Sequence, residues 1–189
     1  MTKILISLMI TIFSTVSFQA SADKLVFNKV IDDVTYVSQL SKFKIDPASN
    51  LPQNIKAAYI QIRLLGDKPV SAALTSYRAF SCPAGRFCTM MMPIPLTVQV
   101  RVNDFSINAC GVKIYQGTTT GGNQTENSLI KLTVVDNTNN SCPTIASLDP
   151  TEVIYETVNT ETHQTSHSVL AGSKLEVQNE VHNTETLVQ

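Results

Sequence analysis

Apolar and polar residues alternate along several short segments of the chain, which is the pattern of a β-strand buried on one face. The clearest case is residues 93–102, where Val98 and Val100 are apolar and their neighbours are polar. Pro93 and Pro95 begin this segment, and proline within a sheet is found mainly on edge strands or at the first position of a strand. We therefore expect this strand to lie at a sheet edge or to start at these prolines.

Comparable segments recur roughly every 10 to 20 residues, with turn-forming residues between them. This spacing is typical of an antiparallel β-sandwich or barrel, so the chain is predicted to be all-β with at most one short helix. The last two predicted strands flank a tip rich in Gly and Thr, which indicates a hairpin. The predicted strands are residues 24–30, 34–40, 57–65, 72–80, 93–102, 111–116 and 128–136.

One segment is compatible with a helix. Residues 52–59 follow Ser49 and Asn50, either of which could cap a helix, and Pro52 lies near the first turn. An irregular loop is the alternative interpretation, and the sequence leaves both open.

The composition changes towards the end of the chain, where residues 149–189 are rich in Thr, Asn, Glu and His. Alternation is confined there to residues 153–157 and 175–177. Two interpretations remain open: a final hairpin of the same domain that turns at residues 171–173, or a partly disordered tail. The expected organisation is a β domain over residues 23–148, followed by this C-terminal segment.

The beginning of the chain has the pattern of a secretory signal peptide. Lys3 is followed by an apolar stretch over residues 4–18 and by a small-x-small end at Ala20 and Ala22. The alternative is a membrane anchor, but about 15 apolar residues are fewer than the roughly 20 that a spanning helix needs. Residues 1–22 are therefore predicted to be cleaved, which makes the mature chain secreted or periplasmic with no membrane span.

Export changes how the four cysteines are interpreted, because disulfides persist outside the reducing cytosol. An even number of cysteines in an exported chain predicts two disulfides, and four cysteines allow three pairings. We favour one bridge around a tight Pro-Ala-Gly segment and another across the predicted hairpin. These bridges are Cys82–Cys88 and Cys110–Cys142. Structural zinc sites use paired C-x-x-C spacings, which the chain lacks.

A Cys82–Cys88 bridge would close a small ring with Arg86 and Phe87 at its rim. A constrained ring loses little further entropy on binding, and Arg and aromatic residues often carry the energy of an interface. Arg86 and Phe87 are therefore candidate partner-binding residues. Two other interpretations remain: the bridge only pins a turn, or Arg86 occupies the acidic pocket of a trypsin-like protease, as an inhibitor would.

Charge and motifs narrow the function classes. The 14 Lys and Arg residues balance 15 Asp and Glu residues, and no basic run is present, which argues against nucleic acid as a partner. Motifs for nucleophilic catalysis or phosphate binding are absent, so neither an enzyme nor a cofactor is expected. His163 and His167 are four residues apart, a distance of about 13 Å along a strand, which is too far for one metal ion. We expect no metal site there and treat these histidines, with His182, as solvated surface residues.

These features together favour an exported, disulfide-stabilised binding module that contacts a protein or a glycan at the cell envelope or outside the cell. The alternative is a structural or surface-assembly protein, because Thr- and Asn-rich strands with little charge can add to the edge of another sheet. A secreted hydrolase is a third reading, since its carboxylates can be scattered without a motif.

Overall fold

The computed structural model describes residues 26–78, 95–120, 128–142 and 148–188, and this part of the chain contains strands and no helix. The predicted all-β fold class is confirmed. The strands are β1 (Val26–Lys44), β2 (Ile55–Leu65), β3 (Lys68–Arg78), β4 (Pro95–Ile107), β5 (Lys113–Thr120), β6 (Ser128–Asp136), β7 (Thr151–Asn159), β8 (Thr165–Gly172) and β9 (Glu176–Val188).

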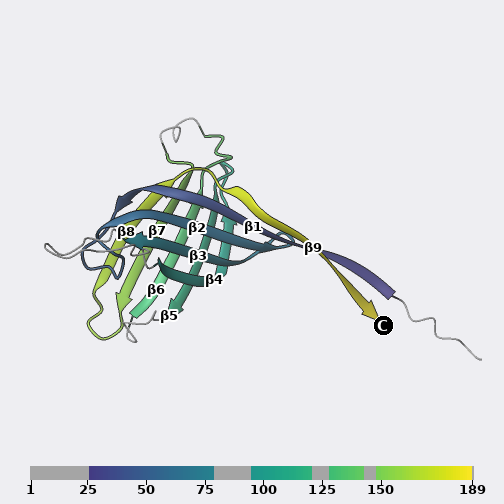
Figure 1. Ribbon diagram of the computed structural model, residues 1–189, viewed down its shortest axis with the longest axis horizontal. Coiled ribbons are helices and arrows are strands. Elements are labelled where there is room, and N and C mark those ends of the chain that lie inside the picture. The colour runs from purple at the N-terminus through teal and green to yellow at the C-terminus, as the bar shows by residue number, and fades with distance from the viewer. Residues whose placement is uncertain (1–25, 79–94, 121–127, 143–147, 189) are drawn as a thin grey trace, which may run out of the picture.

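Strands β1 to β8 form a closed antiparallel barrel, so the barrel rather than the sandwich is the architecture observed (Figure 1). Each strand pairs with the next along the chain, and β1 closes the ring by pairing with β2 on one edge and with β8 on the other. Leu40 marks this closure, since its register partners are Ala58 in β2 and Gly172 in β8. Closure removes the free edges that an open sheet would expose.

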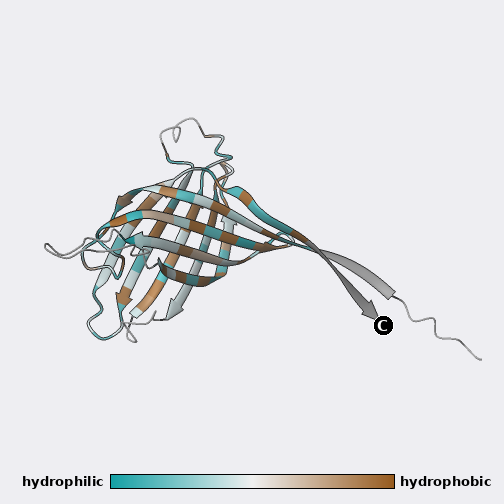
Figure 2. Ribbon diagram, viewed as in Figure 1, coloured by the Kyte–Doolittle hydropathy of each residue, from teal (hydrophilic) through white to brown (hydrophobic). Residues whose placement is uncertain are grey.

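The hydrophobic core lies inside the barrel, because every second residue of a strand points inward. In β7, Val153 and Tyr155 are buried and the residues between and beside them are half-buried. Figure 2 shows the same alternation as short apolar and polar bands along the strands. The largest fully buried apolar side chains are Tyr155, Leu40, Ile60, Ile62, Leu74, Leu132, Leu170, Val100, Val134 and Val153.

Strand β4 begins at Pro95, whose register partner is Tyr77 of β3. Because β4 pairs with both β3 and β5, it is not an edge strand. Of the two expectations for the prolines, the start of a strand is therefore the one observed for Pro95, while Pro93 lies outside the described residues.

The prediction of two separate N-terminal strands, residues 24–30 and 34–40, is wrong, because β1 is one continuous strand through Asp32 and Asp33. Asp32 and Asp33 separate the two predicted strands in the sequence, but in the structure both residues pair within the sheet. Asp33 faces the Arg63 guanidinium across the strands, with Arg63 Nη2 2.5 Å from Asp33 Oδ2. A cross-strand ion pair thus accommodates the acidic residue within a long strand.

The helix alternative for residues 52–59 is also wrong. Turns and bends occupy residues 47–51 and 53–54, and β2 then begins at Ile55. The alternating residues Ala58 and Ile60 are fully buried in the barrel, and this burial requires a strand at the end of the segment.

The last hairpin turns at residues 160–164, between β7 and β8, and not at residues 171–173 as predicted. After β8 the chain continues along β1 into β9 without reversing. Gly172 ends β8 and lies against β1, where an added Cβ would collide with the Gln39 carbonyl oxygen and the Leu40 Cα. Glycine at position 172 therefore allows β8 and β1 to lie close together, and it does not form a turn.

The first half of β1 and strand β9 form a two-stranded ribbon that extends away from the barrel (Figure 1). Strand β2 accompanies β1 only from Asp33 onward, so the outer part of the ribbon has two strands. No helix in the described part of the chain is long and apolar enough to cross a membrane.

The Cys110–Cys142 disulfide predicted from the hairpin spacing is confirmed, with the two Cα atoms 5.3 Å apart. It lies just outside the β5–β6 pairing, whose last register partners are Lys113 and Asp136. Cys82 and Cys88 lie outside the described residues, so their pairing stays a prediction.

Candidate functional site

The connections between strands alternate between the two ends of the barrel, because consecutive strands run in opposite directions. The β2–β3, β4–β5 and β6–β7 connections lie at one end, together with the passage from β8 to β9. We call this the disulfide end, because Cys110 and Cys142 are in two of these connections. Arg78 and Pro95, which end β3 and begin β4, lie at the opposite end.

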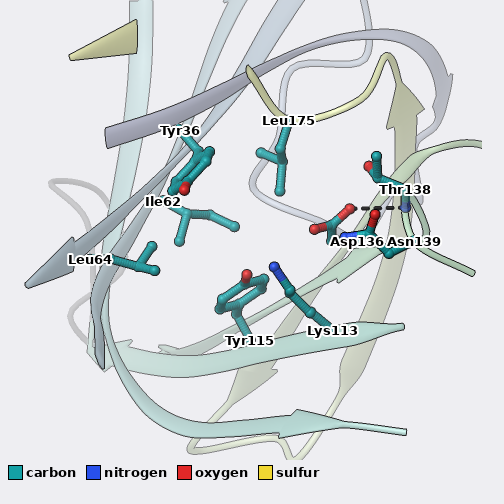
Figure 3. Close-up of a pocket in the computed structure, with 9 residues that line it drawn as sticks. All are labelled: Tyr36, Ile62, Leu64, Lys113, Tyr115, Asp136, Thr138, Asn139 and Leu175. Carbon is teal, nitrogen blue, oxygen red and sulfur yellow. Dashed lines mark hydrogen bonds between the residues drawn. The ribbon is translucent and has the colours of Figure 1, made fainter. Parts of the chain in front are cut away.

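A cavity of about 260 Å³ lies at the disulfide end (Figure 3). Small-molecule pockets usually measure about 300 to 1,000 Å³, so this cavity suits one small molecule or a single unit of a larger partner. Its walls come from β1, β2, β5 and β6 and from two connections, which are far apart in the sequence.

One wall of the cavity is apolar and the facing wall is polar (Figure 3). Ile62 and Leu64 reach the cavity from β2, and Leu175 reaches it from the passage between β8 and β9. On the polar side, Lys113 begins β5 and Asp136 ends β6. The cavity is therefore amphipathic, with side chains of both charges.

Asp136 is the acidic group of the cavity. Only 6% of its surface is exposed, and its Oδ1 accepts a hydrogen bond from the backbone N–H of Thr138 at 3.0 Å. Its register partner is Lys113, whose side chain is half-buried. The ion pairs found among the described residues involve other side chains. Lys113 and Asp136 thus face the same cavity without being paired to each other.

Two phenols, Tyr36 and Tyr115, add hydroxyl groups to the cavity (Figure 3). Burial raises the pKa of Tyr115 well above its usual value, and the nearby Asp136 carboxylate and Tyr36 raise it further. The Tyr115 hydroxyl is protonated at neutral pH, as an unshifted phenol also is, and it can donate a hydrogen bond. Its ring stacks on Phe105 of β4 with centroids 5.0 Å apart, which helps to hold the phenol in place.

The rim beside the polar wall is tied together by the disulfide and by backbone contacts. The Ser141 N–H donates to the Cys110 carbonyl oxygen at 2.8 Å. Gly111 has a φ of 81°, and an added Cβ would lie 2.7 Å from the carbonyl oxygen of Asn139, a residue that lines the cavity. Glycine therefore permits the two connections to approach each other, and the crosslinked rim keeps this wall of the cavity preformed.

The partner-binding candidates from the sequence, Arg86 and Phe87, lie outside the described residues, so their role stays a prediction. Of the histidines, His163 lies in the β7–β8 turn with a φ of 56°. His167 is exposed on β8, with its Nδ1 3.5 Å from Glu156 Oε1. Within the described ranges, no three His, Cys, Asp or Glu residues gather as metal ligands would.

Sequence reasoning missed the residues of the cavity. Asp136 carried a signal, because it continues the inward alternation of Leu132 and Val134 and so places a carboxylate on the buried side of β6. Tyr36 and Leu175 carried none, since they approach the same cavity only when the barrel closes.

Comparison of the chain with protein-family models, with curated proteins and with solved structures finds no match.

Proposed function

We propose that this chain is an exported binding module and that the cavity at the disulfide end is its binding site. The ligand is a small amphipathic molecule, or one unit of a protein or glycan partner that the cavity can hold. The observation that carries the proposal is the preformed space between an apolar wall at Ile62, Leu64 and Leu175 and a polar wall at Lys113 and Asp136. Concave sites with an apolar lining and a few polar groups are the usual form of ligand pockets.

The test combines native mass spectrometry with a variant that fills the cavity. The oxidised mature domain is incubated with the low-molecular-weight fraction of envelope extract and culture medium, and bound species are detected as mass shifts. Leu175→Trp places a large ring in the cavity from a connection outside the barrel strands. Leu129→Trp is the matched control, because Leu129 is 37% exposed on β6 and does not line the cavity.

We expect the unaltered domain and Leu129→Trp to retain the same bound species and Leu175→Trp to lose it. A species that binds all three proteins equally would contradict the cavity as the binding site. Thermal unfolding of each variant shows whether a loss of binding comes from a loss of fold.

A second candidate function is assembly through sheet edges, which the ribbon favours. Strand β9 pairs with β1 along one edge, and no described strand pairs with its other edge. A two-stranded ribbon is marginal in isolation, whereas a third strand adds stability. Size-exclusion chromatography with light scattering over a wide concentration range tests this function. Concentration-dependent oligomers would support assembly, and a monomer at every concentration would contradict it.

A further inference from the structure

The two opposite charges of the cavity restrict the kind of ligand that it can hold. Lys113 and Asp136 are register partners on adjacent strands, and the Cβ atoms of such partners lie about 5 Å apart. Both side chains reach into the same small space (Figure 3). A ligand that satisfies both must carry an anionic and a cationic group only a few ångströms apart.

From this juxtaposition we infer that the ligand is a free α-amino acid with an aliphatic side chain, an inference that rests on the proposed function of the cavity. Its carboxylate binds the Lys113 ammonium, and its ammonium group binds the Asp136 carboxylate. The aliphatic side chain lies against Ile62, Leu64 and Leu175 on the opposite wall.

The charge balance of this arrangement supports the inference. Placing a single ion in a buried site leaves an uncompensated charge, whereas a zwitterion between Lys113 and Asp136 gives two pairs with no net charge. Buried ion pairs also need additional hydrogen bonds, and the hydroxyls of Tyr36 and Tyr115 stand at the same cavity to provide them. An internal peptide segment carries neither terminal charge, and a peptide end carries only one of the two.

The experiment measures, by isothermal titration calorimetry, the binding of four probes with the same branched alkyl group. L-Leucine carries both charges, 4-methylpentanoate only the carboxylate, 3-methylbutylamine only the ammonium group, and 3-methylbutan-1-ol neither. We expect saturable binding of L-leucine and binding at least about tenfold weaker for each of the other three probes.

Two variants assign each charge to its partner. Lys113→Met is expected to weaken the binding of L-leucine about tenfold but not that of 3-methylbutylamine, which has no carboxylate and then pairs with Asp136 without a neighbouring ammonium group. Asp136→Asn keeps an oxygen that can accept the hydrogen bond from the Thr138 N–H. This variant is expected to weaken the binding of L-leucine but not that of 4-methylpentanoate. Lys131→Met is the matched control, since Lys131 pairs with Glu156 away from the cavity.

The outcomes separate this inference from the proposed function. If L-leucine and 3-methylbutan-1-ol bind equally well, the inference of a zwitterionic ligand is overturned, and the cavity remains a candidate binding site for apolar ligands. If none of the four probes binds, the inference is overturned, and the Leu175→Trp comparison alone decides the proposed function. If a variant does not fold, the four probes on the unaltered protein still give a decisive answer.

Discussion

Tyr155 provides the most quantitative test of the barrel interior. It lies on β7 between Leu132 of β6 and Ser168 of β8, and none of its surface is exposed. Its hydroxyl is buried and has no hydrogen-bond partner among the described residues. Burial raises the pKa of Tyr155 from 10.0 to about 12, because the charged phenolate is disfavoured away from water.

The raised pKa makes stability fall with pH between about 10 and 12. Above pH 10 the tyrosine ionises in the unfolded chain but stays protonated in the folded protein until the pH reaches about 12. The unfolded state therefore binds fewer protons over this interval, and the free energy of unfolding decreases as the pH rises. At pH 12, where the tyrosine is half ionised in the folded protein, the loss is about 2 kcal/mol.

Tyr155→Phe removes the titrating group while keeping the ring in the core. Between pH 9 and pH 12 the free energy of unfolding of the variant is expected to fall by about 2 kcal/mol less than that of the unaltered protein. At pH 7 it should be at least as stable, since a buried hydroxyl without a partner costs about 1 to 3 kcal/mol. Tyr115 titrates in both proteins, so its contribution cancels in the difference.

Urea unfolding followed by far-UV circular dichroism at pH 7, 9, 10, 11 and 12 measures both effects. Parallel pH dependence in the two proteins would refute the reasoning, because it would show that Tyr155 ionises alike in the folded and unfolded states. A variant that is less stable at pH 7 would show that the hydroxyl has a partner in solution.

Three further predictions concern the crosslink, the barrel closure and the surface. Replacing Cys110 and Cys142 together by Ser should lower the free energy of unfolding by about 4 kcal/mol in urea, since their sequence separation is 32; an unchanged midpoint would contradict this. Gly172→Ala should destabilise the protein by about 1 to 3 kcal/mol in the same assay, because its methyl group would meet the β1 backbone. The hydrogen bond from Arg63 lowers the pKa of Asp33 below 3.8. The contribution of this pair to the stability of the fold is therefore present above pH 3.8 and is lost as the pH falls through the lowered pKa. Arg63→Gln should raise that pKa towards 3.8 in an NMR titration, and an unchanged value would show that the pair is absent in solution.

Local alternation was enough to predict most of the strands, since the two-residue period of a strand is a property of neighbouring residues. The predicted strand 128–136 coincides with β6, and its hairpin with β5 and the Cys110–Cys142 bridge were predicted because their partners are close in sequence. Asp32 and Asp33 misled the prediction, because the sequence alone does not show the cross-strand arginine that pairs with Asp33.

The closure of the barrel and the cavity were decided only by the tertiary structure. The β1–β8 pairing joins Leu40 to Gly172, and a local pattern contains no information about contacts between segments so far apart. The same closure brings Tyr36 and Leu175 to the end of the barrel where Lys113 and Asp136 lie opposite each other on adjacent strands. The sequence by itself therefore determined which residues point inward, whereas the way the ends of the sheet meet determined which of those residues share one cavity.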